Sequence, residues 1–274
     1  MWTITGFADE VGDDFAEQLA LLDEISVKHV EFRSAWGIRV LDLDDDQLRR
    51  AKQMLDEAGV QVSALGTDLG KIKITDDFGP HLERTKHACE VAKFLETDNL
   101  RGFSFFIPEG ENADDYRDEV LSRMHQMIEV CEQAGINYLH ENEKDIYGDI
   151  PARCADLRAE ISSQNFSLIL DPANYVQCDV HPFEAYTELK EDITYVHVKD
   201  ALFADDSVVP AGEGDGQWPQ IIDGLNQDGY DGFFSIEPHL GAYNEYGADT
   251  GPELWQKAHD SFVALLDERG IAHA

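Results

Sequence analysis

Short apolar segments alternate with longer amphipathic segments along the whole chain, and this alternation constrains the fold more than any other feature. We expect strands at residues 3–9, 29–33, 60–66, 99–105, 136–142, 166–171, 193–200 and 231–238. We expect a helix after each of them, at residues 13–26, 44–59, 81–95, 114–134, 151–161, 181–190, 217–227 and 252–268. Strands that alternate with helices pair in parallel through right-handed crossovers. Eight such units take about 250 residues, so residues 1–274 are predicted to be one α/β domain, a single (β/α)8 TIM barrel.

The helix ends carry ordinary stop and start signals. The segment 44–59 has acidic residues in its first turn and ends at Gly59, and Pro151 stands at the start of the helix expected at 151–161. An open doubly wound sheet is the rival architecture. That fold normally has a glycine-rich phosphate turn after its first strand, and GFADEVGDD at residues 6–14 is not one. The barrel is therefore favoured.

The charge balance is strongly acidic, with 56 Asp and Glu against 21 Lys and Arg and a formal net charge of −35. This charge argues against a nucleic-acid partner, because phosphate binding needs a basic face. The content of hydrophobic residues, 43%, is that of a folded protein, so we interpret the acidity as a halophilic surface rather than as disorder. The apolar runs are too short to span a membrane, and the N-terminal segment does not resemble a signal peptide. We expect a cytoplasmic protein.

The cysteines are isolated along the chain and form no C-x-x-C pair, so a zinc ribbon or a redox motif is not indicated. Cys89 and Cys131 fall in expected helices. Free cysteines pack as small hydrophobic residues. We therefore predict that these two belong to the core.

Four consecutive expected strands end in a potential metal ligand. The segments LHENE, ILDPAN, YVHVKD and FSIEPH supply Glu141, Asp171, His197 and Glu237, with gaps of 30, 26 and 40 residues between the ligands. Parallel strands of a barrel end at the same face, where active sites lie, so these side chains should meet. Each of them has a structural explanation when taken alone, but four at barrel spacing indicate a common site.

Three buried carboxylates repel one another unless a cation neutralises them. A divalent metal ion supplies that cation, and three carboxylates with one imidazole make a hard, oxygen-rich site. We therefore predict one divalent ion held by Glu141, Asp171, His197 and Glu237. Mn²⁺ is favoured, with Mg²⁺, Co²⁺ and Zn²⁺ as alternatives.

The motifs HENE, DPAN, HVKD and IEPH, together with the GEGDGQWP loop, resemble those of the xylose-isomerase-like TIM barrels. That family is described broadly as sugar phosphate isomerases and epimerases, and it shares the AP endonuclease family 2 superfamily. The resemblance covers essentially the whole chain. It implies an enzyme that acts on a small sugar or polyol, and barrels of this type often pair, so a homo-oligomer is one expectation.

In the ketose 3-epimerases of this family, a Glu-Asp-His-Glu set binds one ion, and its two glutamates act as acid and base. The resemblance places these catalytic roles on Glu141 and Glu237. A metal that coordinates a carbonyl and the adjacent hydroxyl stabilises an enediolate. One glutamate then removes the proton from one face of the carbon and the other returns it to the opposite face.

The chain also departs from the epimerase pattern. Asn174, Phe203 and Tyr147 stand where those epimerases have a His, an Arg and a Glu that hold the free sugar. This puts a 3-epimerase activity of the D-tagatose type in doubt. Lys199 lies on the same strand face as His197 and is a third catalytic candidate, as an electrophile, a proton donor or a phosphate partner.

Further polar residues near the strand ends are candidates for substrate binding. They are Glu31, Arg33, Asn142, Asn174, Glu213 and His239. Three enzyme classes remain open. The leading hypothesis is a metal-dependent isomerase or epimerase, and the second is a dehydratase of a keto-polyol such as an inosose. A phosphodiesterase or AP endonuclease is the third and is disfavoured, because those enzymes cluster three zinc ions and need histidines on earlier strands.

Overall fold

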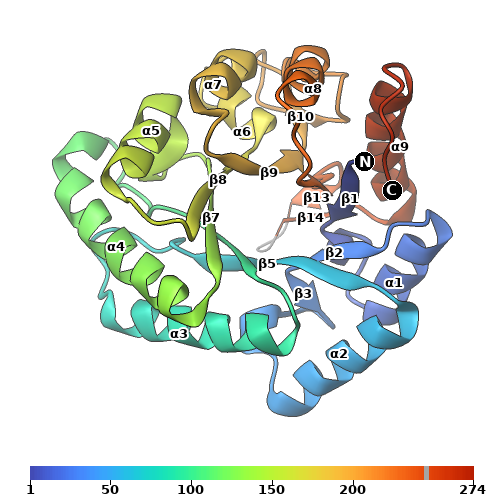
Figure 1. The fold of residues 1–274 in the computed structure, drawn as a ribbon, viewed down its shortest axis with the longest axis horizontal. Coiled ribbons are helices and arrows are strands. Elements are labelled where there is room, and N and C mark those ends of the chain that lie inside the picture. Colours follow the sequence, from blue (N-terminus) through green and yellow to red (C-terminus); the bar gives the residue numbers. More distant parts are fainter. Residues whose placement is uncertain (244–246) are drawn as a thin grey trace.

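The computed structural model of the chain describes residues 1–243 and 247–274. Eight parallel strands form one sheet in the order β1-β12-β9-β8-β7-β6-β5-β2. They are β1 (Thr3–Gly6), β2 (His29–Phe32), β5 (Gln61–Leu69), β6 (Asn99–Gly102), β7 (Asn137–Glu141), β8 (Phe166–Leu170), β9 (Ile193–Val198) and β12 (Phe233–Ile236). β1 and β2 lie next to each other at the two ends of this order, so the barrel is nearly closed (Figure 1). The predicted TIM barrel is confirmed.

Helices surround the sheet, and Figure 1 shows them as an outer ring. They are α1 (Phe15–Glu24), α2 (Asp45–Ala58), α3 (Gly79–Phe94), α4 (Arg117–Ala134), α5 (Pro151–Glu160), α6 (Pro172–Val176), α7 (Pro182–Leu189), α8 (Trp218–Gln227) and α9 (Pro252–Asp267). The predicted caps are present. Asp44 and Gln47 form a capping box at the start of α2, and Gly59 ends that helix in the left-handed conformation.

The expected boundaries differ from the observed ones mainly where strands end. The third strand continues as β5 to Leu69, and its register with β6 shifts between Gly66 and Leu69. The sequence did not predict the short helix α6, nor three small hairpins that follow barrel strands. The hairpin strands are β3 (Ser34–Ala35) with β4 (Ile38–Arg39), β10 (Asp200–Ala201) with β11 (Val208–Val209), and β13 (Ala242–Tyr243) with β14 (Ala248–Asp249).

A small apolar cluster inside the barrel supports the face that carries the expected ligands. Its members are Ala64, Leu139, Ile169 and Tyr195, all buried. Leu139, Ile169 and Tyr195 each stand two residues before an expected ligand on the same strand. Side chains two positions apart on a strand point the same way, so the ligands that follow must also point inward.

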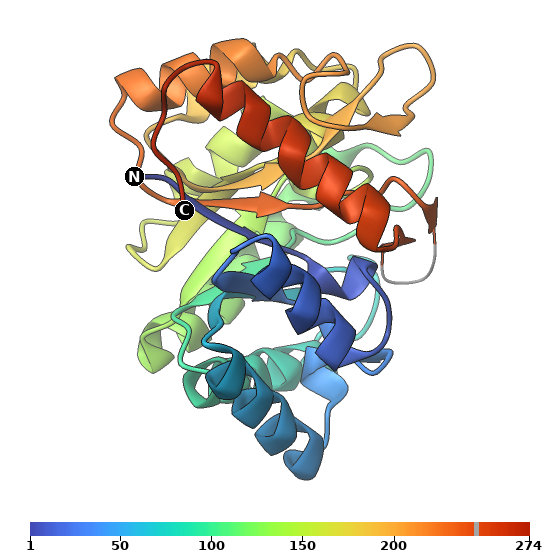
Figure 2. The same ribbon diagram turned by 90° about the vertical axis from the view of Figure 1, so that its right-hand side faces the viewer.

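The opposite end of the barrel carries a row of hydrogen-bonded asparagine side chains at the starts of three neighbouring strands. Asn165 Nδ2 donates to Asn137 Oδ1 at 3.1 Å, and Asn137 Nδ2 donates to Asn99 Oδ1 at 3.0 Å. Asn99 Nδ2 continues the row to the carbonyl of Ser63 at 2.9 Å. The two chain ends also lie side by side near this end, with Trp2 N donating to Ala272 O at 2.9 Å (Figure 2).

Cys89 on α3 and Cys131 on α4 are buried and free, and their sulfur atoms lie 3.8 Å apart. The prediction that they are core residues is confirmed. In the part of the chain that the structure describes, no helix combines the length and the apolar character needed to cross a membrane.

Candidate active site

Four consecutive barrel strands bring one potential metal ligand each to the same point. Glu141 is the last residue of β7, Asp171 follows β8, His197 lies in β9 and Glu237 follows β12. One ligand atom from each residue lies within 4.8 Å of every other, and all four side chains are buried. The structure therefore brings together the four residues that the spacing selects.

The ends of β7 and β8 are held in register by one side chain. Asn142 Oδ1 accepts the Asp171 N–H, and Asn142 Nδ2 donates to the Asp171 carbonyl, both at 2.9 Å. Asp171 also caps α6, because its Oδ1 accepts the Asn174 N–H at 2.9 Å. Asn174 Nδ2 in turn donates to Glu141 Oε1 at 3.1 Å. Asn174 thus orients the carboxylates of Glu141 and Asp171, and Asn142 holds the backbone of Asp171. Their expected contact with substrate stays a prediction.

The imidazole of His197 lies between two carboxylates. Its Nε2 is 3.1 Å from Glu31 Oε2, and its Nδ1 faces Glu141 Oε1 at 3.2 Å. His197 Nδ1 and Asp171 Oδ2 are buried and make no well-aligned hydrogen bond with the described residues, although each lies within ion-pair distance of a charged group. Burial opposes protonation of His197, but Glu141 and Glu31 outweigh it and raise its pKa well above the usual range. Where a metal cation replaced the Nδ1 proton, Glu31 would still hold the proton on Nε2, and the Nδ1 lone pair would face the cation. This donor set fits a divalent cation.

Two cations of the chain contact the same carboxylates. Lys199 Nζ lies 2.7 Å from Glu237 Oε2 and 2.9 Å from Asp171 Oδ2. Arg101, in β6, donates from Nη1 to Glu141 Oε2 at 3.2 Å. Lys199 was predicted from the sequence as a site residue, whereas Arg101 was not. A charged residue in the middle of the apolar strand NLRGF is the signal that indicates it.

The charges in this cluster set its pKa values. Burial alone would raise the pKa of Glu141, but His197 and Arg101 outweigh it and hold that pKa at about 2. Burial likewise opposes ionisation of Glu237, and Lys199 outweighs it, so the pKa of Glu237 lies well below its usual range. Burial raises the pKa of Asp171 to about 7. Asp171 is therefore about half protonated near pH 7, whereas Glu141 and Glu237 are ionised.

The remaining predicted residues lie beside the cluster on the side of β1 and β2. Arg33 Nε binds Asp9 Oδ2 at 2.7 Å, and its Nη1 is 3.8 Å from Glu237 Oε1. The backbone N–H of His239 donates to Glu10 Oε2 at 2.9 Å. Asp9 and Glu10 were not predicted as site residues.

Glu213 lies elsewhere. Its side chain is 53% exposed and faces Lys257 Nζ of α9 at 3.6 Å. The loop that carries Glu213 folds back over Asp200, whose carboxylate accepts the N–H groups of Gly212 and Gly214. That attachment turns Glu213 outward.

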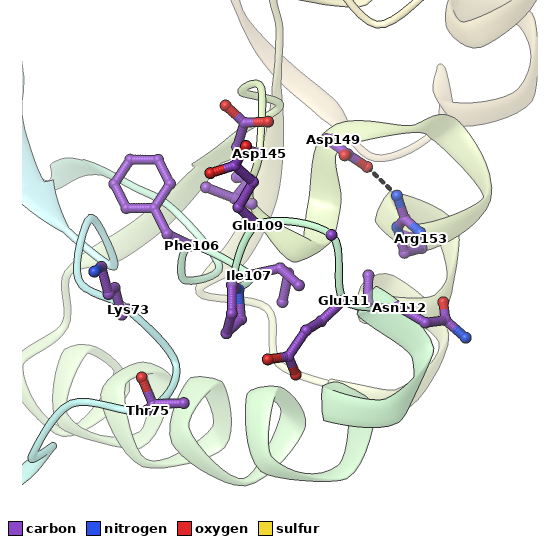
Figure 3. A pocket seen from close by; sticks show the side chains of 14 residues that line it. Lys73, Thr75, Phe106, Ile107, Glu109, Glu111, Asn112, Asp145, Asp149 and Arg153 are labelled. Atoms are coloured by element: carbon purple, nitrogen blue, oxygen red, sulfur yellow. Dashed lines mark hydrogen bonds and ion pairs between the residues drawn. The ribbon is translucent and has the colours of Figure 1, made fainter.

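A cavity of about 420 Å³ opens onto the cluster. It is lined by Arg33, Arg101, Asn174, Lys199, Glu237 and His239, among others. A larger hollow of about 950 Å³ lies among the loops after β5, β6 and β7 (Figure 3). None of the four expected ligands lines that hollow, so the smaller cavity is the candidate active site.

The sequence matches the family described as xylose isomerase-like TIM barrel over residues 8–264. The chain belongs to this family. Two curated relatives are an uncharacterized protein of Methanocaldococcus jannaschii and the 3-dehydroshikimate dehydratase of Bacillus anthracis. The first is 26% identical over 57% of this chain and 56% of the relative, and the second is 20% identical over 62% and 61%. The matched segments thus span less than two thirds of either relative.

Solved structures agree with the fold over nearly the whole chain. A D-tagatose 3-epimerase-like protein superposes with a TM-score of 0.79 at 17% identity, covering 97% of both chains. The IOLI protein with a bound zinc atom gives 0.79 at 14%, covering 97% and 98%. A Mycobacterium smegmatis barrel in complex with magnesium gives 0.72 at 17%, also covering 97% and 98%. At these identities the likeness defines the fold alone.

Proposed function

We propose that this chain is a metal-dependent isomerase or epimerase of a small sugar or polyol, and that it transfers a proton next to a carbonyl. The observation that carries the proposal is the convergence of Glu141, Asp171, His197 and Glu237 within 4.8 Å at the carboxyl ends of the strands. These residues would hold one divalent ion. Mn²⁺ is favoured, because three carboxylates and one imidazole make a hard ligand set.

The chain's own residues divide the work of the reaction. When bound, the ion polarises the substrate carbonyl and stabilises the negative charge of the enediolate. Glu141 removes the proton from one face of the carbon, and Glu237 delivers a proton to the other face, or the reverse. Their low pKa values keep both carboxylates ionised in the free protein, so the one that removes the proton is available as a base, and the one that delivers a proton must first take it up from solvent. Arg101 and Lys199 hold the two carboxylates in place.

The substrate should differ from that of the D-tagatose-type epimerases. Tyr147 directs its hydroxyl to Asp156 Oδ2 at 2.7 Å, and Phe203 packs against the ring of His181. The side-chain amide of Asn174 donates to Glu141 Oε1 at 3.1 Å. The three residues that replace the sugar-binding positions of those epimerases therefore engage neighbours within the protein.

A second candidate function is dehydration of a cyclic or open-chain keto-polyol. It is favoured by Lys199, because an ammonium 2.7 Å from Glu237 can protonate a leaving hydroxyl after the α-proton is lost. The similarity to a 3-dehydroshikimate dehydratase is compatible with it. A nuclease is not proposed, since the described residues contain one such ligand group and that chemistry requires three zinc ions.

The test is deuterium incorporation from D₂O at the α-carbon of ketoses, inososes and their phosphates, followed by mass and NMR. We expect exchange that requires an added divalent ion. Glu141→Gln and Glu237→Gln should each lower the exchange rate by about 10²–10⁴-fold. Glu188→Gln, an exposed carboxylate of α7, is the matched control and should exchange normally.

The mass of the product separates the two candidates. A product of unchanged mass supports isomerisation or epimerisation, and loss of one water supports dehydration. Absence of exchange with every carbonyl compound, in protein shown to bind Mn²⁺, would overturn the proposal.

A further inference from the structure

The cavity at the cluster reverses the charge balance of the protein. The chain has 56 acidic and 21 basic residues. The basic residues that line the cavity are Arg33, Lys71, Arg101, Lys144 and Lys199, and the acidic ones are Glu143 and Glu237. The larger hollow in Figure 3 follows the general pattern instead, with acidic Glu109, Glu111, Asp145 and Asp149 against Lys73 and Arg153. The concentration of cations is thus specific to the cavity that holds the cluster.

Three of these cations form a row interleaved with two phenyl rings. The guanidinium of Arg33 lies 4.6 Å from the ring of Phe7, and that of Arg101 lies 4.8 Å from the same ring. Arg101 also lies 5.1 Å from the ring of Phe103, which Lys71 Nζ contacts at 4.3 Å. We call Arg33, Arg101 and Lys71 the cation row. The rings attract the cations and fix their spacing along one wall of the cavity.

The cation row and the metal ligands come from opposite halves of the barrel. Phe7 and Arg33 follow β1 and β2, and Lys71 follows β5, whereas Arg101 lies in β6. All four expected ligands come from β7, β8, β9 and β12. A molecule in this cavity therefore has the proton-transfer groups on one side and three cations on the other.

The cation row keeps some donor capacity beyond its protein partners. Arg33 Nη1 lies 3.8 Å from Glu237 Oε1, beyond hydrogen-bond distance. Lys71 binds Glu143 at 2.7 Å, but its side chain is 31% exposed at the rim. Arg101 is more fully engaged, because its Nη1 donates to Glu141 Oε2 at 3.2 Å and its Nη2 donates to the carbonyl of Thr67 at 3.4 Å. Arg33 and Lys71 can therefore bind an incoming anion directly, and Arg101 adds positive charge between them.

We propose that the cation row binds an anionic group of the substrate, a carboxylate or a phosphate, while the reacting carbons lie at the Glu141–Glu237 pair. This inference rests on the proposed function for the location of the chemistry. Both anions offer several negative oxygens that accept N–H groups from Arg and Lys together. A cavity lined by five basic and two acidic side chains, in a protein of net charge −35, also concentrates anions where they react.

The experiment measures binding, separately from turnover. Inorganic phosphate and acetate probe the row directly by calorimetric titration at constant ionic strength. D-fructose, D-fructose 6-phosphate and D-fructuronate then form a matched series that differs at one carbon. Each titration is repeated with Lys71→Met, with Lys71→Arg, and with Lys86→Met, which removes an exposed lysine of α3 as a control.

We expect at least one anionic ketose to bind about tenfold more tightly than D-fructose, as a charged hydrogen bond allows. Lys71→Met should remove most of this preference and most of the phosphate or acetate binding. Lys71→Arg should restore both, and Lys86→Met should leave them unchanged. Tighter binding of the 6-phosphate than of the uronate assigns a phosphate to the substrate, and the reverse order assigns a carboxylate.

The proposal is overturned if D-fructose binds as tightly as both anionic ketoses, if neither simple anion binds, or if Lys86→Met weakens binding as much as Lys71→Met. Deuterium exchange in the same samples separates this result from the proposed function. Deuterium exchange without a preference for anionic ketoses would support the proton transfer and contradict the anion subsite. A preference for anionic ketoses without exchange would support the subsite and contradict the proton transfer.

Discussion

His197 illustrates how the site is determined at the level of single residues. Glu31 is fully buried, and its Oε2 lies 3.1 Å from His197 Nε2. This contact fixes the orientation of the imidazole ring and therefore the direction in which Nδ1 points. The sequence led us to expect that Glu31 contacts substrate, and this stays a prediction. Its position behind His197, an expected metal ligand, also suits a residue that orients the imidazole and increases its basicity.

We expect Glu31→Gln to weaken Mn²⁺ binding about 10–100-fold, because the neutral amide holds the imidazole less firmly and adds no negative charge behind it. Calorimetric titration with Mn²⁺ measures the effect. Glu188→Gln again serves as the control. An unchanged affinity for Mn²⁺ would show that Glu31 does not position the ligand.

Glu10 gives a prediction about pH. Burial raises its pKa from 4.5 to about 7, and its Oε1 lies 3.3 Å from His239 Nδ1, which has no hydrogen-bond partner among the described residues. Protonated Glu10 can donate to that nitrogen. Because the folded-state pKa is the higher one, this contribution to stability is complete below pH 4.5 and is lost as the pH rises through 7. It amounts to about 3 kcal/mol, since tenfold in proton affinity is about 1.4 kcal/mol.

Glu10→Gln keeps a neutral donor at every pH. The unfolding free energy of the variant should therefore fall less between pH 5 and pH 8 than that of the unchanged protein, by about 2 kcal/mol. Urea unfolding at constant KCl concentration compares the two. Parallel pH profiles would contradict the assignment to Glu10.

The positions of single residues could be predicted from the sequence where the geometry of the barrel alone determines them. Glu141, Asp171 and Glu237 stand at strand ends, and parallel strands end at one face whatever the side chains do. Arg101 was missed because it lies within a strand, and only the packing of its guanidinium against Phe7 shows that it reaches the cluster. Such contacts depend on elements far apart in the sequence.

At the level of elements, one buried carboxylate organises the loop between β11 and α8. Asp200 Oδ2 accepts the N–H groups of Gly212 and Gly214 at 2.9 and 3.1 Å, and its Oδ1 accepts that of Gly216 at 2.7 Å. A Cβ on Gly214 or Gly216 would approach Asp200 Oδ1 to 2.4 or 2.5 Å, so the loop needs glycine there. The GEGDGQWP motif was visible in the sequence, but its anchor on Asp200 was not.

Asp200→Asn should destabilise the protein by about 1–3 kcal/mol, because the amide nitrogen cannot accept a hydrogen bond and leaves loop donors unpaired. Hydrogen exchange should show faster exchange at Gly212, Gly214 and Gly216. Asp205→Asn, an exposed residue whose carboxylate accepts from Ser207, is the control in the preceding hairpin. Unchanged protection of the three glycine amides would exclude this role for Asp200.

At the level of the whole molecule, the sequence predicted the order of strands and helices because each unit repeats one amphipathic pattern. It predicted less well what happens after each strand. The short helix α6 and the three hairpins contain few residues and little periodicity, so their conformations are set by contacts across the barrel face. The charge of −35 is also a property of the whole molecule, and it predicts behaviour that no single contact explains.

We propose that the acidic surface is adapted to high salt. Cations are few, 21 against 56 acidic residues, and many of those at the surface are paired, as in Lys28 with Asp23 and Arg49 with Asp46. The acidic residues therefore far outnumber the cations that could neutralise them. Their mutual repulsion is screened over about 3 Å at 1 M salt but over about 30 Å at 0.01 M. Dialysis from about 2 M to 0.01 M KCl should therefore lower the melting temperature by about 10 °C or more, which corresponds to a few kcal/mol for a chain of this size. Sucrose added at low salt is the control, because a neutral osmolyte does not screen charge. A melting temperature independent of KCl would contradict the adaptation, since repulsion on this scale cannot be present and also be insensitive to screening.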